Sequence, residues 1–108
     1  EFESAADRYA RRIRFNEFEK AAAFLGPGEA GETGVPSLPL LRKVRVSDYE
    51  VLGRRTDPDG LGVRQTVEIR YYRTDELVER SIRDEQYWRY DPDRMKWFLE
   101  TGLPAFTE

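Results

Sequence analysis

The sequence predicts a single α+β domain, with two N-terminal helices packed on a four-stranded antiparallel meander sheet. Residues 2–25 carry apolar side chains at helical spacing, whereas the chain after residue 40 alternates apolar and polar side chains with period two. Turn-forming Asp, Pro and Gly residues separate the alternating runs, as expected for an antiparallel sheet. The length of 108 residues fits one compact core, so we assign residues 1–108 to a single domain.

The composition excludes several classes of function. The chain contains 18 Lys and Arg residues and 21 Asp and Glu residues, and this formal net charge of −3 argues against a nucleic-acid partner. It contains no Cys and no His, so it lacks a thiolate nucleophile, an imidazole base and the usual zinc ligands. We therefore expect neither a metal nor a cofactor.

Two helices are predicted within residues 2–25. The first carries apolar residues spaced by four, three and four positions, which places them on one face: Phe2, Ala6, Tyr9 and Ile13. Ser4 and Asp7 are expected to form a capping box at its start. Asn16 is expected to be the N-cap of the second helix. The buried stripe of that helix is predicted to comprise Phe18, Ala22 and Leu25.

Residues 26–39 are predicted to form a loop. This segment holds four glycines and three prolines, which cannot continue a regular helix or an inner strand. Two apolar residues, Val35 and Leu38, are expected to anchor it to the core. The sheet is then predicted to occupy residues 40–106.

The first strand changes the face on which its apolar residues lie. Val44 and Val46 fall on one parity, whereas Tyr49 and Val51 fall on the other. This change predicts a β-bulge within Ser47-Asp48, since one extra residue moves every later side chain to the opposite face.

The remaining strands are separated by Asp-Pro turns. Asp57-Pro58-Asp59-Gly60 and Asp91-Pro92-Asp93 are predicted to be tight turns, because their spacing lacks the oxygen ligands of a calcium loop. Between them, Tyr72 is expected to face Leu77 across a loop of residues 73–76. Continued along the sheet, this register places Trp88 opposite Trp97.

Five segments carry a resemblance to a known family: residues 14–23, Leu41–Val46, Glu85–Tyr90, Trp97-Phe98-Leu99 and Leu103–Phe106. Through them, most of the chain after Phe15 resembles small proteobacterial envelope lipoproteins of unassigned function within the NTF2-like superfamily. The resemblance implies a sheet curved around the helices as a cone, and a location on the periplasmic side of the cell envelope. It implies that only a leader and a lipidated Cys, absent from this sequence, attach the protein to a membrane. A cystatin-like roll with one long helix is the alternative architecture.

Polar residues on the inner face of the sheet form the candidate site. They are Arg80, Asp84 and Gln86, together with Gln65, which the predicted register places opposite Asp84. Polar groups on a buried face must be hydrogen-bonded or line a wet cavity. We hypothesise a ligand pocket with apolar walls from Tyr71 and Trp88, in which Arg80 holds an anionic group. The competing interpretation places these residues at an end of the sheet that emerges into solvent.

Two functions are compatible with such a pocket. The first is a non-catalytic domain that binds a small apolar or anionic ligand or a protein partner. The second is a small isomerase or dehydratase in which Asp84 is the base and Tyr90 or Arg80 assists it. The wider superfamily contains both enzymes and binding modules. Because the chain has no His to match the catalytic members, we favour the binding function.

The outer face of the sheet is the candidate partner surface. Four residues of one parity are expected to form an exposed apolar stripe there: Tyr72, Leu77, Tyr87 and Phe98. Members of the superfamily often pair through their sheets, so the resemblance implies a homodimer formed by this stripe.

Overall fold

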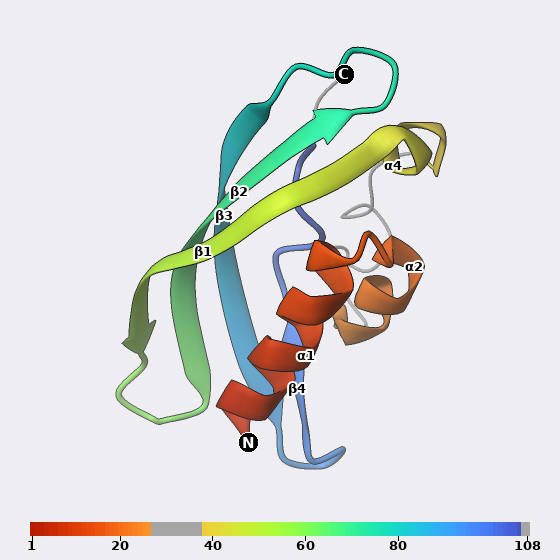
Figure 1. Ribbon diagram of the computed structural model, residues 1–108. Helices are drawn as coiled ribbons and strands as arrows, with labels where there is room; N and C mark the ends of the chain where they lie inside the picture. The colour runs from red at the N-terminus through yellow and green to blue at the C-terminus, as the bar shows by residue number, and fades with distance from the viewer. Residues whose placement is uncertain (27–37, 107–108) are drawn as a thin grey trace.

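The computed structural model describes residues 1–26 and 38–106. In chain order its elements are α1 (Phe2–Arg14), α2 (Phe18–Ala21), the 3₁₀ turn η1 (Ala22–Phe24), α4 (Leu38–Lys43), β1 (Val44–Thr56), β2 (Gly62–Arg73), β3 (Arg80–Asp91) and β4 (Lys96–Leu99). The strands form one antiparallel sheet in the order β1-β2-β3-β4 (Figure 1). The predicted α+β class, with N-terminal helices and a four-stranded meander, is confirmed.

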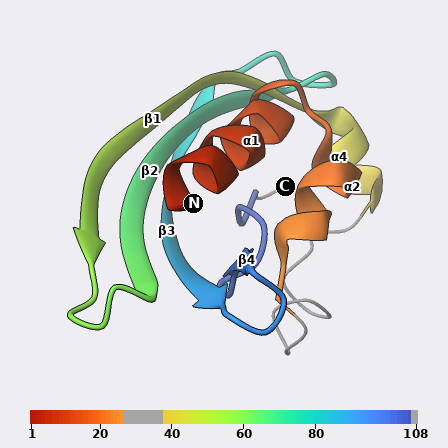
Figure 2. The same ribbon diagram turned by 90° about the horizontal axis from the view of Figure 1, so that it is seen from below.

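The helix α1 lies against the inner face of the sheet, and the long strands bend gently past it (Figure 2). The sheet is not closed or strongly curled, so it differs from the cone that the resemblance implied. At one edge, the backbone of Leu25 and Gly26 runs beside β4, where Gly26 N–H donates to the Leu99 carbonyl at 3.2 Å. The strand β1 forms the opposite edge.

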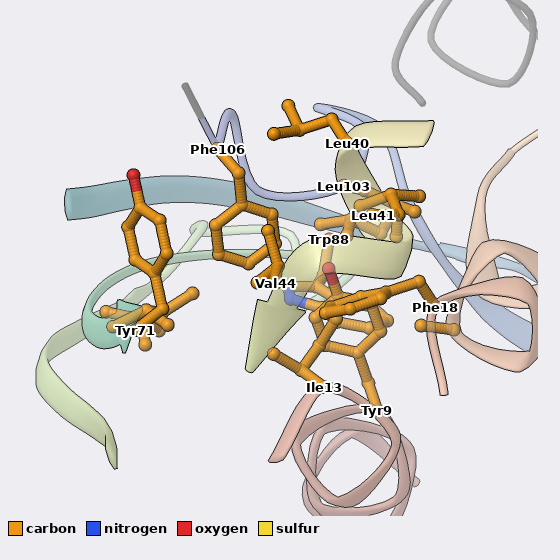
Figure 3. Packing of buried hydrophobic residues seen from close by; sticks show 14 of the residues in the cluster. Tyr9, Ile13, Phe18, Leu40, Leu41, Val44, Tyr71, Trp88, Leu103 and Phe106 are labelled. Carbon is orange, nitrogen blue, oxygen red and sulfur yellow. The ribbon is translucent and has the colours of Figure 1, made fainter. Parts of the chain in front are cut away.

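Trp88 is at the centre of the core between α1 and the sheet. Its side chain is fully buried and meets three rings edge-to-face, with centroid distances of 5.9 Å to Phe2, 5.3 Å to Tyr9 and 6.2 Å to Phe24. Figure 3 shows Trp88 close to Tyr9 and Ile13 of α1. The apolar stripe predicted for the first helix is therefore the face that α1 buries, although Phe2 is only partly covered.

The C-terminal segment closes the other end of the core. Phe106 lies between Tyr71 of β2 and Phe18 of α2, with ring centroids 4.8 Å and 5.4 Å away, respectively. Leu103 is buried beside it (Figure 3). The sequence analysis assigned this segment to the sheet, but β4 ends at Leu99, and the chain then packs onto the helices.

The predicted capping box at the start of the first helix is wrong. The N-cap is Glu1, whose Oε1 accepts the backbone N–H of Ser4 at 3.2 Å. Because the helix begins at Phe2, Ser4 lies inside its first turn and cannot act as the cap. Asp7 lies further inside the helix, on its exposed surface.

Asn16 is not the N-cap of the second helix. The cap position is Glu17, and α2 continues only to Ala21 before the chain tightens into η1. Asn16 instead turns the chain between α1 and α2 with a left-handed backbone φ of 61°. Its side-chain Oδ1 accepts the backbone N–H of Val46 at 2.7 Å, so the corner between the helices is tied to β1.

Replacing Asn16 by Ala is expected to lower the free energy of unfolding by about 2 kcal/mol. About half of this loss comes from the hydrogen bond to Val46, and about half from placing a Cβ in the left-handed region. Asn16→Gly removes the hydrogen bond but tolerates the backbone, so it should lose less. Urea unfolding of the three proteins measures both losses. An Asn16→Ala variant as stable as the parent would contradict this role.

The β-bulge predicted within Ser47-Asp48 is confirmed, since the register of β1 against β2 shifts between Val46 and Asp48. A second shift, between Val51 and Gly53, leaves Leu52 without an opposite residue and was not predicted. The strand also begins later than residue 40, because α4 occupies the preceding residues. Of the two predicted loop anchors, Leu38 begins α4 and Val35 lies outside the described residues.

Both Asp-Pro segments are turns, as predicted. In the first, Gly60 has a φ of 72° and donates its N–H to the Asp57 carbonyl at 2.9 Å. In the second, Asp91 Oδ1 accepts the backbone N–H groups of Asp93 and Arg94 at 2.9 and 3.2 Å. These bonds from the turn hold the pKa of Asp91 below its usual value.

The predicted register between the second and third strands is wrong by two residues. Tyr71 pairs with Arg80, and the loop comprises residues 74–79 because Leu77 adopts a φ of 57° and extends the turn. Leu99, rather than Trp97, pairs with Trp88, so the same offset recurs in the last hairpin. A shift of two preserves the face of every side chain that stays in a strand, which is why Gln65, Asp84 and Gln86 were still assigned to the inner face, whereas Leu77 of the outer stripe lies in the loop.

Candidate functional site

Three of the predicted inner polar residues meet in one hydrogen-bond network. Gln86 is its centre, and its Nε2 donates to Asp84 Oδ2 at 2.9 Å and to the Tyr49 hydroxyl at 3.1 Å. Gln86 Oε1 accepts Gln65 Nε2 and Trp88 Nε1, each at 2.9 Å. Gln65 and Gln86 are each only 3% exposed, so these bonds satisfy amide groups that burial would otherwise leave without partners.

The register shift changes the partners that the sequence analysis gave this network. Gln65 lies opposite Gln86, and Asp84 lies opposite Val67. Gln65 Oε1 in turn accepts Arg54 Nε at 3.1 Å. The Arg54 guanidinium stacks over the Phe2 ring, with its carbon 4.9 Å from the ring centroid, and connects the network to the start of α1.

Arg80 does not belong to this network. It lies opposite Tyr71, at the start of β3, and its NH2 forms an ion pair with Glu76 Oε2 at 2.7 Å. Tyr90 is near the other end of β3, where its ring packs on Trp97 with centroids 5.3 Å apart. The arrangement of Asp84 with Arg80 or Tyr90 that the enzyme hypothesis requires is therefore not assembled.

Burial changes the ionisation of the groups around Asp84. Desolvation raises the pKa of Asp84 to about 6, although its hydrogen bond from Gln86 opposes the shift and the nearby charge of Glu85 adds to it. The pKa of Tyr49 is also raised, mainly by burial. Asp84 is thus a carboxyl group that takes up a proton in mildly acidic solution.

Tyr9 brings a buried hydroxyl into the same region. Its side chain is fully buried, and its hydroxyl oxygen has no hydrogen-bond partner among the described residues. Its pKa is raised well above the usual value by burial and, secondarily, by the charges of Asp84 and Tyr49. The sequence analysis placed Tyr9 on the buried stripe, but a helical stripe does not reveal that a hydroxyl on it will lie close to a carboxyl group.

Asp84 and Arg80, the residues of the predicted pocket, line neither of the two best-formed cavities in the described part of the molecule. Trp88 and Tyr71, expected as pocket walls, are fully buried core residues that contact other rings. The inner polar residues therefore satisfy one another inside the fold.

The larger cavity lies at the other end of the molecule, between α1, η1 and the β3–β4 hairpin. Its volume is about 660 Å³. We call it the Trp97 cavity; it is lined by Glu1, Ala5, Arg8, Ala23, Phe24, Gly60, Leu61, Tyr90, Met95, Lys96, Trp97 and Phe98. Figures 1 and 2 show the first turns of α1 and the strand β4 at this same end. The sequence analysis named Tyr90 only as a helper of Asp84, and it did not predict this cavity.

Two aromatic rings on the lining of the Trp97 cavity pack against other rings of the core. Trp97 packs edge-to-face against Phe2, with ring centroids 5.2 Å apart. Phe24 packs against Tyr9 in the same manner, with a centroid distance of 5.7 Å. Because these contacts restrict the rings, the cavity presents two apolar surfaces that need little reordering when a ligand enters.

The second cavity, of about 570 Å³, lies between the end of α1, α2 and α4. Phe15 on its rim is an exposed aromatic side chain. Two of its cations, Arg42 and Arg45, form no ion pair with a described residue, whereas Glu17 accepts hydrogen bonds from Arg12 at 2.9 Å and from Lys20 at 3.3 Å. These bonds hold the pKa of Glu17 below its usual value.

The predicted outer stripe is not a continuous apolar surface. Leu77 is 74% exposed but lies in the β2–β3 loop, whereas Tyr72, Tyr87 and Phe98 are half-buried. Polar groups also surround Tyr87, which donates its hydroxyl to Asp57 Oδ2 at 2.9 Å, accepts Arg89 NH1 at 2.9 Å, and lies under the Arg64 guanidinium.

Across residues 1–26 and 38–106, every helix is too short or too polar to cross a membrane. Within the same residues, no group of three or more acidic side chains is arranged to hold a metal ion. Comparison with known proteins finds no family model, no curated protein and no solved structure that matches this chain.

Proposed function

We propose that this domain is a non-catalytic binding module that holds a small ligand with a flat, apolar body in the Trp97 cavity. The observation that carries the proposal is the cavity itself. Its volume of about 660 Å³ lies within the range of about 300–1,000 Å³ that is usual for small-molecule sites. Four aromatic residues line it: Phe24, Tyr90, Trp97 and Phe98.

Aromatic walls favour a particular shape of ligand. A planar ring can stack on the face of Trp97 or meet its edge, and each such contact contributes about 0.5–1.5 kcal/mol beyond the area it buries. Leu61 and Met95 add flexible apolar side chains at the mouth of the cavity, and Met95 is 77% exposed before any ligand covers it. An unbranched, flexible chain would gain less from rigid rings than a planar body does.

The second candidate function is the Asp84-dependent isomerase or dehydratase. The raised pKa of Asp84 favours it, because a base with a pKa of about 6 can both accept and release a proton near neutrality. Neither described cavity reaches Asp84, however, and its neighbours are hydrogen-bonded to one another. The binding function is therefore the stronger proposal.

The resemblance of the five segments supports two further proposals: that the chain is a member of the NTF2-like superfamily, and that it is located in the bacterial cell envelope. A homodimer formed through the outer face of the sheet is a separate proposal. Fractionation of cells that express the natural gene tests the location, and sedimentation of the purified domain tests the dimer.

Binding is tested by titrating the domain with 2-naphthylacetate and with 2-naphthaleneethanol, two flat probes of similar size. We expect saturable binding of at least one probe by calorimetry, with NMR shifts at the Trp97 indole and at Leu61. Absence of saturable binding by both probes, or shifts confined to the residues around Phe15, would overturn the proposal.

A variant that fills the cavity provides the structural control. Ala23 is exposed on the cavity wall, so Ala23→Trp should block the space without removing a core contact. We expect it to weaken probe binding at least about tenfold. Ala105→Trp places the same side chain at an exposed position outside the cavity lining and should bind the probe as the parent does.

A further inference from the structure

The Trp97 cavity has two cationic side chains on its lining, Arg8 from α1 and Lys96 from the start of β4. They reach the cavity from different elements. Arg8 lies over the Phe24 ring, whereas Lys96 is followed in β4 by Trp97, whose side chain points to the opposite face of the strand, so only Arg8 is placed beside an aromatic wall.

Arg8 is held in place but keeps donors unused. Its Nε donates to the Ser4 carbonyl at 3.3 Å, and its guanidinium carbon lies 5.8 Å from the centroid of the Phe24 ring. Neither terminal nitrogen of Arg8 forms a hydrogen bond or ion pair with another described residue. The side chain is therefore oriented by its inner nitrogen while the outer pair stays available to a bidentate acceptor.

Lys96 is likewise without a counter-ion in the described part of the chain, because no hydrogen bond or ion pair engages its Nζ. The one acidic side chain on the cavity lining is Glu1, and its carboxylate already accepts the N–H of Ser4 as the cap of α1. The other cavity also has cations without an ion pair among the described residues, Arg42 and Arg45, but Arg45 NH1 already donates to the carbonyls of Arg42 and Val44, each at 2.9 Å.

We propose, on the basis of the proposed function, that the ligand of the Trp97 cavity is an amphipathic anion: a flat apolar body bearing one carboxylate. The body packs on Trp97 and Phe24, while the carboxylate accepts hydrogen bonds from the Arg8 fork and the Lys96 ammonium. A hydrogen bond to a charged group is roughly twice as strong as a neutral one, so the anionic group decides which flat molecules bind well.

Three probes that share a naphthyl body test this assignment: 2-naphthylacetate, 2-naphthaleneethanol and 2-(2-naphthyl)ethylamine. We expect the carboxylate to bind at least about tenfold more tightly than the alcohol, and the amine to bind most weakly. Raising the salt concentration should reduce the advantage of the carboxylate while leaving the affinity of the alcohol nearly unchanged.

Variants that remove the charge but keep most of the side chain test whether Arg8 and Lys96 cause the preference for carboxylate. Arg8→Gln combined with Lys96→Gln should reduce the preference for carboxylate over alcohol to less than about threefold, without loss of alcohol binding. Arg83→Gln is the matched control, because Arg83 is exposed on the sheet and does not line the cavity. Thermal unfolding establishes that each variant is folded.

The outcomes separate the two proposals. Equal affinity for carboxylate and alcohol, tightest binding of the amine, or an unchanged preference in the double variant would each overturn the anion assignment while the cavity remains a binding site. If none of the three probes binds, the proposed function fails first. A preference that is lost in the Arg8 and Lys96 variants and kept in the Arg83 variant supports the assignment.

Discussion

Replacing Trp88 by Ala is expected to lower the free energy of unfolding by about 3–5 kcal/mol. The indole is fully buried and touches Phe2, Tyr9 and Phe24, so its removal leaves a cavity between α1, η1 and β3. A domain of this size has a total stability of only about 5–15 kcal/mol, so the variant should be marginally folded. Chemical unfolding followed by far-UV circular dichroism measures the loss.

Trp88→Phe separates packing from hydrogen bonding. Phenylalanine fills most of the same space but cannot donate to Gln86 Oε1, to which Trp88 Nε1 donates at 2.9 Å. We expect it to lose about 1–3 kcal/mol, clearly less than Trp88→Ala loses. If Trp88→Ala lowered the free energy of unfolding by less than about 1 kcal/mol, Trp88 would not be the centre of the core.

The stability of the parent protein is expected to fall as pH rises from about 4 to about 6, because of Asp84. An unfolded Asp titrates near pH 3.9, whereas burial raises the pKa of folded Asp84 to about 6. Between these values the folded state binds the proton more tightly, so its advantage is complete below about pH 4 and is lost as pH rises through about 6.

Asp84→Asn should remove this dependence, because an amide has no proton to lose and can still accept the bond from Gln86. We expect the variant to be more stable than the parent at pH 7 by about 3 kcal/mol, and the difference to vanish near pH 4. Urea unfolding from pH 4 to 8 measures both curves.

Other carboxyl groups make the free energy of unfolding change with pH in the opposite direction. The lowered pKa values of Glu17, Asp75 and Asp91 make stability rise with pH in more acidic solution, but parent and variant share this contribution. The control is Asp93→Asn, at an exposed turn position, which should follow the parent curve. Parallel curves for the parent and the Asp84→Asn variant would contradict a buried, proton-binding Asp84.

The sequence predicted those parts of the fold that local patterns determine. The first helix, the bulge after Val46 and both Asp-Pro turns each depend on a few consecutive residues and were confirmed. The β2–β3 register depends instead on the geometry of the loop. Leu77 adopts a left-handed backbone conformation there, which is unusual for leucine and cannot be predicted from the residue type. The error of two residues was invisible to the apolar pattern, because it returned every side chain to the same face.

In the candidate site, too, local patterns were predicted correctly, whereas features that depend on the three-dimensional arrangement were not. Parity correctly assigned Asp84, Gln86 and Gln65 to the inner face, and the structure joins them in one network. Arg80 shares their face but lies four residues before Asp84 in β3, about 13 Å away at the usual rise of a strand, so it was wrongly grouped with them. The Trp97 cavity could not be predicted, because it forms where the start of α1, η1, the first turn and the last hairpin converge in space.

The edge strand β1 has a consequence for how the protein behaves at high concentration. A 13-residue edge would ordinarily invite strands of neighbouring molecules to add to the sheet and begin aggregation. Its two bulges interrupt the backbone geometry that such a strand needs, and the charged side chains of Asp48, Glu50 and Arg55 stand exposed along it. The irregularities of β1 therefore act as protection for an edge that no other strand of the sheet covers, and straightening them would favour fibre-like assembly over solubility.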